Sequence, residues 1–96
     1  MVGLPGQPVI SSVTPSSGVS GQAYTVTITG VATHFTSGTP VVSAGPGVVT
    51  SNVVATQDGT LTVQLTIAAN AAAGPRTLVV TTGVEQAILP NGFVIL

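Results

Sequence analysis

Residues Thr60–Thr82 read TLTVQLTIAANAAAGPRTLVVTT, and they decide the fold. Apolar and polar side chains alternate strictly over the first eight residues. This is the period of a half-buried β-strand, because successive side chains point to opposite faces of a sheet. A connection of small residues then ends at Gly74-Pro75, and a second apolar run begins at Leu78. The stretch therefore predicts two strands joined across a Gly-Pro break, with Leu78 and Val80 facing inward on the second.

The rest of the chain repeats this pattern of short apolar runs separated by turn residues. In Ala23–Gly30, the side chains of Tyr24, Val26 and Ile28 are expected to face inward and the threonines outward. In Val48–Thr56, the inward pair is either Val49 with Val53 or Val48 with Val54. The other predicted strands are Val9–Thr14, Thr39–Ala44 and Phe93–Leu96. About seven short strands at this spacing predict an all-β, immunoglobulin-like β-sandwich.

Turn residues set the connections between these strands. Asp58-Gly59 predicts a hairpin with a type I′ turn, since both central residues of that turn need positive φ. Pro15-Ser16-Ser17-Gly18 fits a type I turn, and Pro90-Asn91-Gly92 is interpreted as a turn into the last strand. The loop Val31–Gly38 is expected to place Phe35 as a plug at one end of the sandwich. Ala68–Ala73 is allowed one helical turn at most, because so short an alanine run is marginal as a helix.

The composition is unusual in its charge. Charged residues make up 3% of the 96 residues, against about 25% in ordinary soluble domains. With Arg76 as the only cation and no cysteine, we expect no nucleic-acid partner, no electrostatic docking to membranes and no thiolate metal site. No apolar run reaches the length of about 18 residues needed to span a bilayer, so membrane insertion is not expected. A net charge of −1 leaves little repulsion between copies, which suits a unit held among neighbours.

The chain divides into two parts by composition. Residues 1–7 are interpreted as a leader or linker, with prolines that discourage pairing. Residues 8–96 are predicted to form a single domain, and about 100 residues is the usual size of such a sandwich. The opening lacks the basic end and apolar core of a signal peptide, so localisation has to be inferred from elsewhere.

Four ordered segments resemble the IPT/TIG domain, an immunoglobulin-like module. The segment from Ile10 to Gly18 is similar to the opening I-x-x-V/I-x-P-x-x-G, and Tyr24 to Gly30 resembles the second strand, with its aromatic displaced to Phe35. Thr60 to Val63 with Ala71 to Pro75 resembles T-x-L-T-V…A-x-A-G, and Asn91 to Val94 resembles the closing N-x-F-x-V. One departure is Ala44, where the family usually has an aromatic before the glycine. The resemblance implies a spacer or interaction module of large extracellular bacterial proteins.

The sequence offers few groups for chemistry. His34 is the only histidine, and Asp58 and Glu85 are the only carboxylates. Asp58 belongs to a hairpin turn and Glu85 to a different tip, so we predict no catalytic residue, no metal ligand and no cofactor site. His34 is expected to be an exposed loop histidine, and the outward threonine rows are interpreted as ordinary solvent-facing strand positions.

The sequence therefore predicts a non-catalytic structural or spacer module, extracellular or on a bacterial cell surface, whose partners are neighbouring domains or copies of itself. Two alternatives remain open. One is a self-assembling subunit of a filament or coat, which the low charge favours. The other is a carbohydrate-binding module, which would need exposed aromatics, whereas Tyr24, Phe35 and Phe93 are mostly required by the core.

Overall fold

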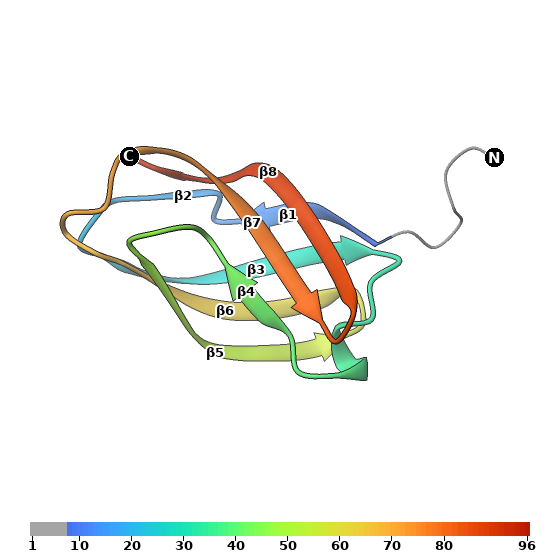
Figure 1. Cartoon of the computed structure of the whole chain (residues 1–96). Helices are drawn as coiled ribbons and strands as arrows, with labels where there is room; N and C mark the ends of the chain where they lie inside the picture. Colours follow the sequence, from blue (N-terminus) through green and yellow to red (C-terminus); the bar gives the residue numbers. More distant parts are fainter. Residues whose placement is uncertain (1–7) are drawn as a thin grey trace.

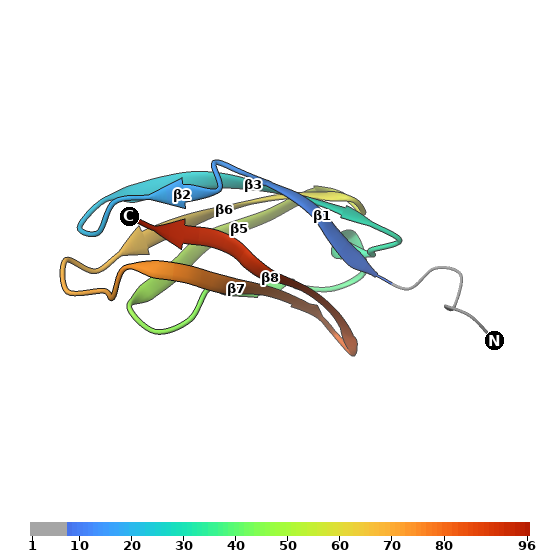
Figure 2. The same ribbon diagram turned by 90° about the horizontal axis from the view of Figure 1, so that it is seen from above.

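The computed structural model describes residues 8–96, so the leader or linker expected at residues 1–7 lies outside the described residues. Within the described part, two four-stranded sheets pack face to face (Figures 1 and 2), with the orders β1–β3–β6–β5 and β2–β8–β7–β4. A 3₁₀ turn, η1, spans Phe35–Ser37. The strands are β1 (Val9–Thr14), β2 (Ser17–Gly18), β3 (Ala23–Val31), β4 (Val41–Ser43), β5 (Val48–Gln57), β6 (Thr60–Ile67), β7 (Gly74–Thr82) and β8 (Glu85–Ile95). The all-β, immunoglobulin-like sandwich predicted from the sequence is confirmed.

The core lies between the sheets and follows the predicted alternation. In β6, every second residue from Leu61 to Ile67 is buried, and Leu78 and Val80 of β7 face them. The largest fully buried side chains include Phe35 and Phe93 at separate places in the sandwich. Burial of branched aliphatic side chains is the main term that holds such sheets together, at roughly 25 cal/mol per Å² of apolar surface. The inward and outward faces predicted for β3, β6 and β7 are therefore correct.

The type I turn expected at Pro15–Gly18 is wrong. The chain leaves β1 in the first sheet through Pro15, after a cis Thr14–Pro15 bond, and enters the second sheet as β2. Ser17 and Gly18 are extended and pair in parallel with Val94 and Ile95 of β8. The residues assigned to the turn thus form a short strand that links the two sheets.

Both inward pairs considered for Val48–Thr56 are also wrong, because β5 contains a bulge. The ladder with β6 shifts between Ser51 and Val54, and Asn52 adopts a left-handed φ of 52°. One extra residue in a strand exchanges its two faces beyond that point. Val48 therefore faces the core before the bulge and Val53 after it.

Two further connections differ from expectation. The hairpin at Asp58-Gly59 is present, but neither residue has a positive φ, so the turn is not type I′. Pro90-Asn91-Gly92 is not a turn either: β8 runs through it, and Asn91 with a φ of 57° marks an irregularity opposite β7. The two extra residues preserve the alternation, so Phe93 and Ile95 are buried as predicted.

Phe35 closes one end of the sandwich, as the sequence predicts. It is fully buried in η1, just beyond the end of β3. A Cβ at Gly30 would lie 3.1 Å from the Phe35 ring and 2.6 Å from Thr33. Only glycine lets the backbone approach so closely.

Ala68–Ala73 forms a turn, with a hydrogen bond from the amide of Ala71 to the carbonyl of Ala68. Among the described residues, no helix is long and apolar enough to cross a membrane.

Candidate functional site

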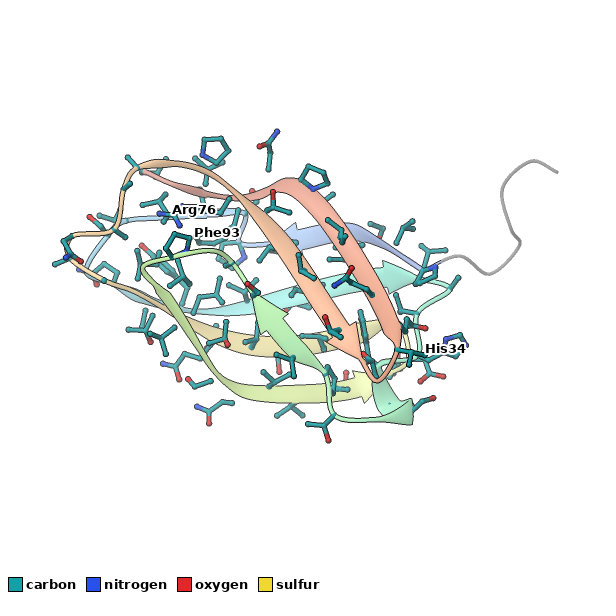
Figure 3. All side chains as sticks on the ribbon, in the orientation of Figure 1. His34, Arg76 and Phe93 are labelled. Carbon is teal, nitrogen blue, oxygen red and sulfur yellow. The ribbon has the colours of Figure 1, made fainter. Side chains whose placement is uncertain are left out.

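The ionisable side chains divide between the two ends of the body (Figure 3). His34 lies at the end where β1 begins, and Arg76 lies at the other, near the C-terminus. Asp58 and Glu85 share the end with His34, since Glu85 is hydrogen-bonded to His34 and Asp58 is hydrogen-bonded to Thr36 in the same loop. The prediction that Asp58 and Glu85 belong to different tips is correct, because Asp58 lies in the β5–β6 turn and Glu85 flanks the β7–β8 turn. The β5–β6 and β7–β8 hairpins bring them to the same end as the loop after β3.

The His34–Glu85 pair joins the loop after β3 to the β7–β8 hairpin. The backbone N–H of His34 donates to Oε1 of Glu85 at 2.8 Å, and Nδ1 lies 2.7 Å from Oε2. This hydrogen bond, together with the charge of Glu85, raises the pKa of His34 above its ordinary value. The His34 side chain remains 59% exposed, as expected for a loop histidine. The sequence shows no sign of the pairing, because 51 residues separate the partners.

Asp58 organises the loop that carries Phe35. Its Oδ1 accepts from the backbone N–H of Thr36 at 3.2 Å and from the Thr36 hydroxyl. These bonds hold the pKa of Asp58 below its ordinary value. The Asp58 carbonyl also accepts from the Thr33 hydroxyl and from the N–H of Phe35. The carboxylate thus fixes the plug at this end of the sandwich.

The three groups do not form the arrangement that nucleophilic catalysis requires. Glu85 orients Nδ1 of His34, as the acid of a triad would. Among residues 8–96, however, no hydroxyl is hydrogen-bonded to the other ring nitrogen. Nor do those residues contain three histidine or acidic side chains grouped to hold a metal ion. Each contact at this end ties one loop to another.

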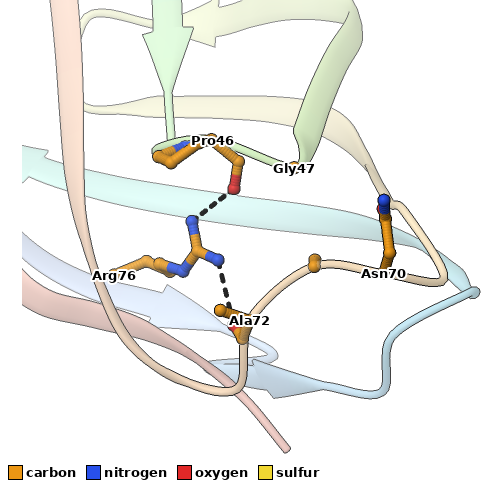
Figure 4. Close-up of a pocket in the computed structure, with 6 residues that line it drawn as sticks. Pro46, Gly47, Asn70, Ala72 and Arg76 are labelled. Carbon is orange, nitrogen blue, oxygen red and sulfur yellow. Dashed lines mark hydrogen bonds between the residues drawn. The ribbon is translucent and has the colours of Figure 1, made fainter.

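At the opposite end, Arg76 lies beside a pocket of about 260 Å³ (Figure 4). One guanidinium nitrogen donates to the carbonyl of Pro46, and the other donates to the carbonyl of Ala72 at 2.9 Å. These bonds tie β7 to the β4–β5 and β6–β7 loops. The pocket is lined by Pro46, Gly47, Asn70, Ala71, Ala72 and Arg76. The sequence does not predict this pocket, because its walls come from three separate parts of the chain.

The aromatic side chains are used within the fold. Phe35 and Phe93 are fully buried, and Tyr24 lies with its ring centroid 6.5 Å from that of Phe93. The Tyr24 hydroxyl accepts a hydrogen bond from the backbone N–H of Val19 at 2.8 Å. Ala44, where the resemblance leads one to expect an aromatic, is itself buried. The adjacent Gly45 lies under Arg76, since a Cβ there would be 3.0 Å from the guanidinium.

Two packed, mainly antiparallel sheets with a chain that switches between them define an immunoglobulin-like module. The IPT/TIG domain family matches residues 8–93, and the chain belongs to that family. A search of curated proteins found no match. Domains of this family are generally non-catalytic modules that mediate interactions with proteins or DNA.

Proposed function

We propose that this chain is a non-catalytic spacer module, arranged in series with other domains or copies of itself in a bacterial cell-surface or secreted protein. The supporting observation is where the chain enters and leaves the body. The described residues measure 43 × 27 × 20 Å, and β1 starts at one end while Leu96 lies at the other (Figure 1). A module with this geometry adds length to a protein in which it is inserted.

The use of the ionisable side chains supports the non-catalytic part of the proposal. The hydrogen bonds of His34, Asp58 and Glu85 join one loop to another, and the guanidinium of Arg76 donates to two backbone carbonyls. If these contacts are structural, the variant with His34→Ala, Asp58→Asn and Glu85→Gln keeps the binding or assembly properties of the parent. A hydrolytic activity that the parent has and this variant lacks would overturn the non-catalytic assignment.

The surface chemistry supports an arrangement of units in series. Because the chain has few charged residues, threonine, serine and glycine make up much of its polar surface, and there is little electrostatic repulsion between copies. Such a surface suits units whose spacing is held by covalent linkage in one chain.

The location is tested on intact cells of the organism that carries the gene. An antibody against the folded chain should bind the cells, or the chain should be recovered from the medium. Protease added outside should remove the cell-bound signal while a cytoplasmic marker protein survives. A chain found only in the cytoplasmic fraction would contradict the proposal.

A further inference from the structure

The most exposed large apolar side chain among the described residues lies at the tip of a hairpin. Val84 is fully exposed, and the two-residue connection Gly83-Val84 joins Thr82 of β7 to Glu85 of β8. Gly83 has a φ of 62°, and Val84 is not a positive-φ residue, which is the pattern of a type II′ turn. The β7–β8 hairpin tip lies at the end of the body where β1 begins (Figure 2), and the turn leaves Val84 fully exposed there.

The pocket beside Arg76 lies at the other end of the body, and it is a hollow that could receive an apolar side chain such as Val84. Its walls are largely small and apolar, from Pro46, Gly47, Ala71 and Ala72. Arg76 is fixed beside them by two backbone carbonyls, and a guanidinium has five N–H donors (Figure 4). Donors therefore remain for an acidic group from outside.

The two ends of the body also differ in charge. The one arginine lies at the pocket end, whereas both carboxylates of the chain, Asp58 and Glu85, lie at the hairpin end together with His34. Two carboxylates against one histidine leave the side chains of the hairpin end net negative even when His34 is protonated. Glu85 follows Val84 directly in the sequence. A hairpin tip inserted in the pocket would bring the acidic end of one molecule toward the cation of the next. Complementary charge of this kind sets the orientation of a contact more than its strength.

We propose that the Arg76 pocket receives the Val84 hairpin tip of a second copy of this chain, so that copies associate head to tail. The two surfaces are different, so the contact is heterologous. It adds units in a row unless the rotation closes a ring. The C-terminus of one copy then lies at the same junction as the β1 end of the next. The inference rests on the proposed function, because an end-to-end contact is useful between units in series.

The contact is tested by NMR on the ¹⁵N-labelled full chain at increasing concentration. Amide signals of Gly47 and Ala71 at the pocket and of Gly83 and Val84 at the tip should shift together. Val84→Lys should weaken the association about tenfold or more, as for loss of a central contact residue. The matched control is Ile88→Lys, an exposed site in mid-strand on β8, and it should associate like the parent.

A complementation experiment distinguishes head-to-tail contact from a symmetric one. Val84→Lys keeps an intact pocket, and Ala72→Glu, at an exposed lining residue, blocks the pocket but keeps an intact tip. Neither variant should associate alone, and their mixture should form a one-to-one dimer. In the mixture, only the pocket signals of Val84→Lys and only the tip signals of Ala72→Glu should shift. If Ala72→Glu loses its dispersed spectrum, Arg76→Gln serves as the pocket variant.

Two results would overturn the inference. Association of either variant alone at the parent's strength would indicate another interface, such as the β5 edge. Absence of any shift in the mixture would show that tip and pocket do not meet. A cytoplasmic location would contradict the proposed function while leaving a positive complementation result intact. A negative result would likewise leave the spacer role standing.

Discussion

Replacing Phe93 by alanine should remove a large share of the stability. The side chain is fully buried in β8, opposite Arg76 of β7, and its ring contacts Tyr24 of the other sheet. Truncation of a buried aromatic costs about 3–5 kcal/mol, from lost apolar burial and from the cavity left behind. The total free energy of unfolding of a small domain is about 5–15 kcal/mol. The midpoint of thermal unfolding should therefore fall by tens of degrees, at about 4–8 °C per kcal/mol.

The assay is urea unfolding followed by circular dichroism, with Leu96→Ala as the control. Leu96 lies three residues away and is 66% exposed, so its truncation should change the free energy of unfolding by no more than about 0.5 kcal/mol. A loss below about 1 kcal/mol for Phe93→Ala would refute the assignment of Phe93 to the core between the sheets.

Three other outcomes follow from named contacts. Gly18→Ala should destabilise the fold by about 1–3 kcal/mol, because its Cβ would lie 2.5 Å from the Tyr24 ring and 3.0 Å from the Phe93 ring. The control Gly38→Ala should cost little, because a Cβ there would lie 3.4 Å from its nearest neighbour. Equal urea midpoints for the two variants would contradict this prediction. Deletion of Phe93–Leu96 should unfold or aggregate the chain, since it strips the partner from β2 and from the start of β7; a cooperative melt near the full-length midpoint would show that the segment is only a tail. The pKa of His34, read by NMR titration, should lie above its ordinary value and return toward it in Glu85→Gln, and the same midpoint in both proteins would exclude the pair. Because the folded pKa is raised, the stabilisation by this pair is fully present below the ordinary pKa of 6.5 and is lost as pH rises through the folded value.

The strands that could be predicted are those in which alternation is uninterrupted. In β3, β6 and β7, a regular pleat links residue parity to the buried face, so sequence alone identifies Val26, Val63 and Val80 as core residues. In β5 the same rule fails at Asn52, where one extra residue exchanges the faces. Asparagine tolerates a positive φ, but nothing local distinguishes such a bulge from a turn or a regular strand position.

The arrangement of side chains at the two ends of the body could not be predicted, because it depends on contacts between residues far apart in the sequence. The His34–Glu85 pair and the Asp58–Thr36 bonds connect separate loops, and the Arg76 pocket has walls from three segments. The sequence identified His34, Asp58 and Glu85 as the groups available for chemistry and placed Asp58 and Glu85 on different tips, but it could not show that both tips contact the loop after β3. The sequence places Glu85 at a tip but does not identify the exposed Val84 beside it, although Gly83 is a usable signal for a type II′ turn.

The central claim is that the chain enters and leaves a rigid sandwich at opposite ends. It is tested most directly by the distance between spin labels at Val9→Cys and Leu96→Cys, measured by pulsed electron paramagnetic resonance. The sequence has no cysteine of its own, and both sites are exposed. The account predicts one narrow distance distribution centred between the 27 Å and 43 Å dimensions of the body. A centre below the 20 Å dimension, or a broad distribution covering the whole range, would contradict it.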